Sequence, residues 1–122
     1  VRATVESLAY ETSDVLAAME MDAGLPITSL RVDGGASANN FLMQCQADIS
    51  QAPVERPCCI ETTAMGAAYL AGLAVGYWPD QETVKQNGAI DRTFEPELSK
   101  EERDEKMNGW HKAVRYAEGW AK

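Results

Sequence analysis

Apolar residues recur with helical spacing near the start of the chain. Positions i, i+3, i+7, i+10 and i+14 are occupied by Val5, Leu8, Thr12, Val15 and Met19. This stripe, with two further apolar residues beside it, predicts a helix over 5–22 that buries one face. Gly24 and Pro26 follow it and are typical of a helix end.

The next segment changes from helical to extended character. Residues Ile27 to Val32 include β-branched side chains and predict a strand, and Asp33-Gly34-Gly35 then indicates a turn. Helical spacing returns with Phe41, Leu42, Cys45 and Ile49. Ser37 or Asn39 can cap the start of this helix. Strand, glycine turn and helix are therefore consecutive.

The second half of the chain continues the alternation. Pro53 to Arg56 is a short strand candidate, and Thr62 or Thr63 can cap a helix that lasts to about Tyr77. Small residues spaced by four in this helix predict a packing seam, an interpretation favoured over the similar membrane dimer motif; they are Ala68, Gly72 and Gly76. The alternation of elements predicts an α/β fold.

The last part of the chain predicts an irregular segment and then a helix. Residues 89–96 lack a clear period, whereas Ser99 and Glu102 form a capping box. Acidic residues from Glu101 to Glu105 fill the first turns and suit the helix dipole. The apolar stripe begins only at Met107, so we expect the earlier turns to project into water.

Composition and charge narrow the function classes. The 122 residues fit one domain, with 45% hydrophobic and 25% charged residues. A formal net charge of −8 disfavours nucleic acid and anionic lipid as partners. The uncharged stretch 62–79 is too weakly apolar to insert in a membrane. Three cysteines without a paired spacing suggest reduced thiols and a cytoplasmic location. The chain starts without Met and looks cut from something longer.

The glycine turn is the feature that suggests chemistry. A glycine turn between a strand and a helix presents backbone N–H groups and the positive end of a helix dipole, so a phosphate can sit there. The simpler interpretation is that Gly34 and Gly35 only turn the chain. The common phosphate-binding motifs do not decide between these two interpretations. G-x-G-x-x-G is absent because no third glycine follows, and the P-loop motif G-x-x-x-x-G-K-[ST] is absent too.

Other candidates for chemistry are weaker. His111 is the single histidine and has no neighbouring nucleophile, so we expect a surface residue. Asp33 can offer one carboxylate to a metal, but its commoner role is to hydrogen-bond its own turn. The residues thus predict no catalytic group and no metal ligand in this chain.

Several blocks in order resemble the FGGY family of carbohydrate kinases. The segment Leu30 to Gln44 resembles the adenosine-binding segment of that family. Further blocks that match are Arg2 to Ser7, Val54 to Pro57, Glu61 to Gly72 and Gly109 to Val114. Together they resemble the glycerol kinases more than the pentulose or gluconate kinases of the family. The departures, at 58–59 and 96–97, lie outside the adenosine segment.

The resemblance implies a fold, a reaction and a set of contacts. It implies an actin-like, ribonuclease H-like domain with few parallel strands, flanking helices and an incomplete sheet, 1–122 being the nucleotide-side portion of the second domain. The implied reaction is phosphoryl transfer from Mg²⁺-bound ATP to glycerol. Gly35 and Asn39 match the family's ATP or ADP contacts, and Gly34 completes the turn. The Mg²⁺ ligands, catalytic base and glycerol site lie upstream, so this chain alone should be inactive.

The resemblance also implies partners. Absence of the family's first three strands leaves the strand near Ile27 to Val32 with an open edge, which predicts self-association, a rearranged edge or missing chain. The N-terminal kinase domain is a further partner that the resemblance implies. Two alternatives remain at this point. One is a non-enzymatic actin-like domain that binds nucleotide or a regulatory protein, with Glu101 to Glu105 as its docking surface. The other is a different FGGY sugar kinase.

Overall fold

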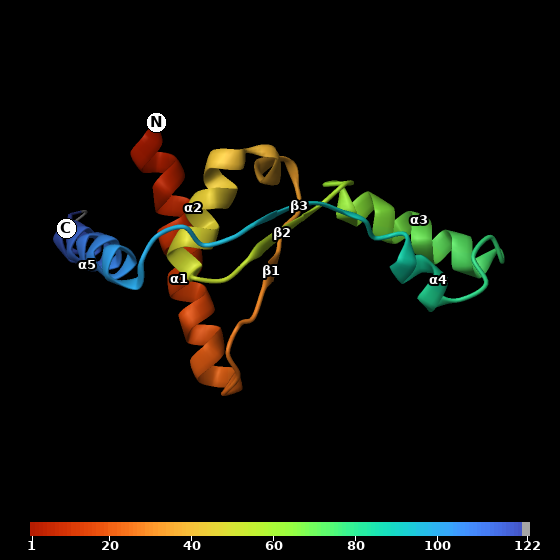
Figure 1. The fold of residues 1–122 in the computed structure, drawn as a ribbon, viewed down its shortest axis with the longest axis horizontal. Coiled ribbons are helices and arrows are strands. Elements are labelled where there is room, and N and C mark those ends of the chain that lie inside the picture. Colours follow the sequence, from red (N-terminus) through yellow and green to blue (C-terminus); the bar gives the residue numbers. More distant parts are fainter. Residues whose placement is uncertain (121–122) are drawn as a thin grey trace.

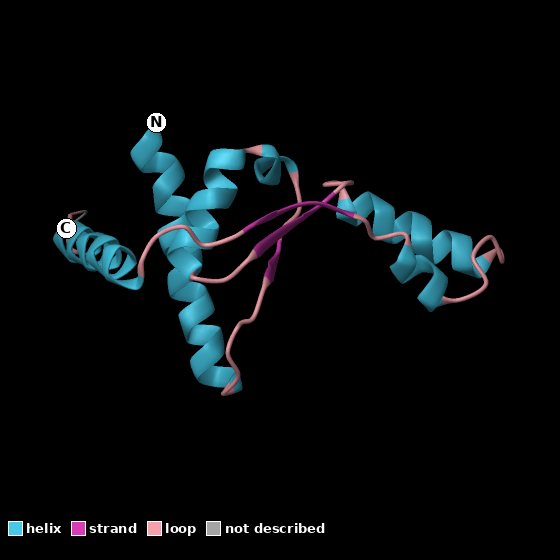
Figure 2. Ribbon diagram, in the orientation of Figure 1, coloured by secondary structure: helices cyan, strands magenta, loops and turns pink. Residues whose placement is uncertain are grey.

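A computed structural model describes residues 1–120, in which a small sheet lies between two groups of helices (Figure 1). The elements, in chain order, are α1 (Arg2–Ala23), β1 (Leu30–Arg31), η1 (Gly35–Ala38, a 3₁₀ helix), α2 (Asn40–Ser50), β2 (Val54–Pro57), α3 (Thr62–Ala74), α4 (Gln81–Gln86), β3 (Ile90–Phe94) and α5 (Lys100–Ala117). Helices α1, α2 and α5 gather on one side of the strands, and α3 and α4 form an arm beyond the other end (Figure 2).

The sheet has three strands in the order β1-β2-β3. β1 and β2 are parallel, with Leu30 opposite Val54, and β2 and β3 are antiparallel, with Val54 opposite Phe94. The predicted α/β class is confirmed. β1 is shorter than the predicted strand, and among the described residues no strand pairs with its outer edge.

Strand β3 corrects the expectation that 89–96 is irregular. Four of its five residues are exposed and only Phe94 is buried, so the sequence carries no alternating apolar signal. The strand is specified instead by backbone pairing with β2. Helix α4 also went unpredicted, although Asp80 caps it by accepting a hydrogen bond from the Thr83 N–H at 2.8 Å.

Two small hydrophobic clusters hold the helices to the sheet. The first joins α2 to the strands and consists of Leu42, Met43, Ala47, Val54 and Phe94. The second joins α1, α2 and α5 through Ala9, Ile49 and Met107. The turn between β1 and α2 therefore lies between buried residues of α2 and the partly buried Leu30 and Val32, which pack against the same cluster.

Helix α1 confirms the predicted helix but not its buried face. It ends at Gly24, whose φ of 64° is left-handed, as expected for a glycine cap. Its buried residues are Ala9 and Ser13, whereas Leu8, Val15 and Met19 of the apolar stripe are exposed. Val5, at the start of the stripe, is partly buried against the first cluster.

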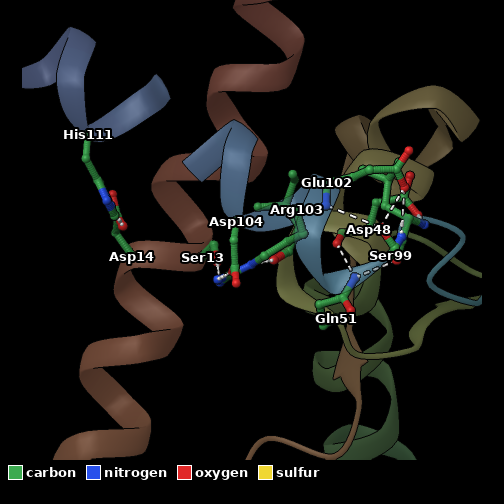
Figure 3. Close-up of polar contacts among 11 residues, drawn as sticks. Ser13, Asp14, Asp48, Gln51, Ser99, Glu102, Arg103, Asp104 and His111 are labelled. Atoms are coloured by element: carbon green, nitrogen blue, oxygen red, sulfur yellow. Dashed lines mark hydrogen bonds and ion pairs between the residues drawn. The ribbon is translucent and has the colours of Figure 1, made fainter. Parts of the chain in front are cut away.

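Helix α5 confirms the capping box, and Glu101, Glu102 and Glu105 of its first turns are exposed as expected. Ser99 and Glu102 make both reciprocal hydrogen bonds. Arg103 does not project into water: its Nε donates to the Ile49 carbonyl at 2.9 Å, and its Nη2 donates to Ser13 Oγ at 3.4 Å (Figure 3). The side chain thus ties α5 to α1 and α2.

Helix α3 differs from expectation at its start and along its seam. Its N-cap is Glu61, without a side-chain hydrogen bond, rather than Thr62 or Thr63. Gly72 does permit a close approach, but by the ring of Trp78 from the following turn, not by another backbone. Among the described helices, none is long and apolar enough to span a membrane.

Candidate functional site

The glycine turn has a conformation that requires glycine at one position. Gly34 has φ 77° and ψ 170°, a region that is open essentially to glycine alone. Its carbonyl accepts from both the N–H (3.0 Å) and the Oγ (2.7 Å) of Ser37, a buried residue. Its own N–H donates to the Ile60 carbonyl at 2.7 Å. The turn is therefore fixed to the segment before α3.

Five N–H groups in and just after the turn have partners within the chain. The N–H groups of Gly34, Ser37 and Asn39 donate to backbone carbonyls. Those of Phe41 and Leu42 donate to the Asn39 side chain. Among the described residues no partner is recorded for the N–H groups of Gly35 and Ala36, so these two can still donate to a ligand.

Gly35 lies at the exposed start of η1. Its φ is outside the positive region, and a methyl group built on it would meet no atom within 4 Å. Neither the backbone nor the packing of this chain therefore demands glycine at this position. The open space beside Gly35 lets a ligand approach the backbone from outside.

Asn39 is the cap that α2 uses, which confirms one of the two predicted caps. Its Oδ1 accepts from the Phe41 N–H at 3.0 Å and the Leu42 N–H at 3.2 Å. These bonds orient the amide and leave Nδ2 without a recorded partner in residues 1–120. The exposed Nδ2 can donate a hydrogen bond to a ligand beside Gly35.

Arg56, which the sequence reasoning missed, braces this turn from β2. Its Nη1 donates to the Ser37 carbonyl at 3.0 Å and to Asn40 Oδ1 at 2.8 Å. Its Nη2 pairs with Asp91 at 2.7 Å. The sequence signal that could have indicated this role is the position of the arginine on β2. Because β1 and β2 are adjacent and parallel, a side chain near the end of β2 lies close to the turn that follows β1.

Asp33 and the cavity beside it lie next to the turn. Asp33 accepts a hydrogen bond from the Thr62 hydroxyl at the start of α3, rather than from its own turn as expected. The cavity has a volume of about 600 Å³ and is lined by residues of the strands, α3 and α4, among them Asp33, Thr62, Tyr69 and Lys85. Gly34, Gly35 and Asn39 are not in its lining.

The remaining candidates form structural contacts. His111 is exposed, as predicted, and its Nε2 lies 2.7 Å from Asp14 Oδ1 (Figure 3). Partial burial raises the pKa of Asp14, but hydrogen bonds from His111 and Trp110 outweigh it and leave that pKa below its usual value. The described residues contain no group of three or more His, Cys, Asp or Glu side chains arranged to hold a metal.

A comparison with family models identifies the domain. Residues 1–75 match the C-terminal domain of the FGGY family of carbohydrate kinases. This chain belongs to the FGGY family. The matched range contains β1, the glycine turn, α2 and β2, the elements that build the candidate site.

Individual FGGY relatives cover the whole chain. A glycerol kinase of Agathobacter rectalis is 63% identical over 122 residues, which are 100% of this chain and 24% of that protein. Glycerol kinase 1 of Clostridium tetani gives the same identity and coverage. The chain thus spans about a quarter of the length of these relatives.

Solved structures of FGGY kinases share the fold. Plasmodium falciparum glycerol kinase with ADP matches with a TM-score of 0.83 and 32% identity over 94% of this chain and 23% of that chain. Xylulose kinase from Lactobacillus acidophilus matches with a TM-score of 0.71 and 22% identity over 95% of this chain and 24% of that chain, which speaks for the fold alone. The fold is part of the actin-like ATPase architecture, as the sequence predicted.

Proposed function

We propose that this chain is the ATP-binding C-terminal portion of a glycerol kinase, with 1–122 as the nucleotide-side part of its second domain. The observation that carries the proposal is the 63% identity to glycerol kinases over the full chain, glycine turn included. The fold similarity to a glycerol kinase with ADP supports nucleotide as the ligand. The enzyme would transfer the γ-phosphoryl group of ATP to glycerol and work in the cytoplasm.

In this proposal Gly34, Gly35 and Asn39 form the chain's part of the nucleotide site. Gly34 gives the turn its shape, Gly35 lets the nucleotide approach the backbone, and Asn39 donates from Nδ2. Within residues 1–120 the N–H groups of Gly35 and Ala36 have no recorded partner and can donate to the nucleotide. Phosphates, Mg²⁺, glycerol and the catalytic base would then be held by the rest of the enzyme.

The first test is catalytic and uses the complete enzyme that contains this chain. ATP turnover should depend on glycerol and be much weaker with D-xylulose or gluconate. Turnover with another sugar in place of glycerol would assign the chain to a different FGGY kinase. Binding without turnover of any of these substrates would favour the non-enzymatic alternative.

The second test concerns the turn. Gly35→Val should raise the KM for ATP by about tenfold or more, a loss of about 1.4 kcal/mol of binding, and change the KM for glycerol little. Gly109→Val is a matched control, because a side chain there also meets no atom within 4 Å but lies on α5. Equal effects of Gly35→Val on both substrates would refute the assignment of the turn to ATP.

A further inference from the structure

Arg56 makes polar contacts on both sides of Asn39. The Ser37 carbonyl lies two residues before Asn39 and the Asn40 side chain one residue after it, and Nη1 of Arg56 donates to both. We propose that Arg56 is a positioning residue, which holds 34–39 in the arrangement that presents Gly35 and Asn39 to the nucleotide. This inference rests on the proposed function.

The guanidinium group is itself fixed in place by β3. Oδ2 of Asp91 accepts a hydrogen bond from Nε at 2.9 Å and lies 2.7 Å from Nη2 in an ion pair, so one carboxylate oxygen holds this side of the group. The ring of Phe94 packs 5.3 Å from its central carbon. Because the Arg56 side chain is only 12% exposed, water competes weakly for these bonds. Arg56 therefore holds the turn in a fixed position relative to the strands.

The need for such a brace follows from the turn's other contacts. On the α2 side, Asn39 is held by its bonds to Phe41 and Leu42. On the η1 side, Gly34 and Ser37 bond to each other, and these bonds by themselves do not tie the turn to the strands. Besides the bond from Gly34 to Ile60, the contacts of Arg56 are the link from η1 to the sheet side. A lysine carries its donors on a single nitrogen, so it could not contact the turn through one nitrogen while Asp91 holds two others.

The chain offers a matched control in Arg92. It lies opposite Arg56 in the β2–β3 register, and its guanidinium packs on the same ring, 4.5 Å from the centroid. The structure records no hydrogen bond from Arg92 to the turn in residues 1–120. A change at Arg92 thus disturbs the Phe94 contact and leaves the brace intact.

The experiment compares Arg56→Gln, Arg56→Lys and Arg92→Gln in the complete enzyme. The measurements are the KM for ATP, the KM for glycerol, kcat, and hydrogen exchange of the peptide covering 33–42. We expect Arg56→Gln to raise the KM for ATP about tenfold, as for loss of one well-placed hydrogen bond to a charged group, with kcat and the KM for glycerol nearly unchanged. Exchange in 33–42 should be faster, Arg56→Lys should rescue little, and Arg92→Gln should resemble the unmodified enzyme.

Two outcomes would overturn the role of Arg56. One is an unchanged KM for ATP and unchanged exchange in Arg56→Gln, and the other is an equal change in Arg92→Gln. If Arg56→Gln does not fold, Asn40→Ala removes one contact of the brace while Asp91 and Phe94 still hold the arginine, and should shift both readouts in the same direction by less. Failure of the proposed function is a different result: the unmodified enzyme would show no glycerol-dependent turnover of ATP. In that case the hydrogen exchange of 33–42 in Arg56→Gln still decides whether Arg56 holds the turn in place.

Discussion

The two glycines of the turn should respond in opposite ways to the same substitution. At Gly34, φ 77° and ψ 170° lie in a region that costs a residue with a side chain about 1–3 kcal/mol. Gly34→Ala should therefore lower the free energy of unfolding by about that amount. Gly35→Ala should leave it unchanged or raise it by less than about 1 kcal/mol, because its backbone and surroundings accept a methyl group.

Urea denaturation of the 122-residue chain, followed by far-ultraviolet circular dichroism, measures this difference. With a denaturant slope of about 1–3 kcal/mol per molar, the midpoint for Gly34→Ala should fall by about 1 M. The midpoint for Gly35→Ala should stay near that of the unmodified chain. Equal midpoints for the two variants, or a larger loss for Gly35→Ala, would refute the assignment of a structural role to Gly34 and a ligand-facing role to Gly35.

Two further predictions concern α3 and the contact between α1 and α5. Gly72→Ala should destabilise the arm by about 1–3 kcal/mol, since the new methyl group overlaps the Trp78 ring. Gly66→Ala in the same helix meets open space and should be neutral or stabilising by up to about 1 kcal/mol. Thermal unfolding of both variants measures the difference, and equal losses of stability would contradict it. The pKa of Asp14 is lower in the folded chain than the value of about 3.9 that it has in the unfolded chain. The ionised carboxylate therefore contributes its full stabilisation above that unfolded-state pKa, and this stabilisation is lost as pH falls through the folded-state pKa. Unfolding midpoints between pH 5 and pH 2 should thus fall more steeply for the unmodified chain than for Asp14→Asn.

Local sequence signals predicted the helices whose ends are marked by capping residues. The cap at Gly24, the Asn39 cap and the capping box at Ser99 each mark a helix end by a local hydrogen bond or backbone conformation. These features depend on neighbours within a few residues, so one sequence is enough to find them. The class of the fold followed from their order.

Features that depend on distant pairing were not predictable in the same way. β3 is a strand because β2 lies beside it, and four of its five side chains face water. The stripe on α1 had the right period, yet its residues Leu8, Val15 and Met19 remain exposed here. Apolar period identifies a helix and the face suited to burial, but it does not identify the partner that buries it.

The candidate site depends both on local backbone conformation and on contacts between distant segments of the chain. A glycine pair after a strand is ambiguous, because one glycine can serve the backbone and the other a ligand, and only the dihedral angles separate Gly34 from Gly35. The shape of the turn then depends on Arg56, whose contacts with Ser37 and Asn40 span 19 and 16 positions of the chain. A nucleotide site on this turn is therefore coupled to the β2–β3 pair, so a substitution at Asp91 that frees the guanidinium should weaken ATP binding without touching the turn itself.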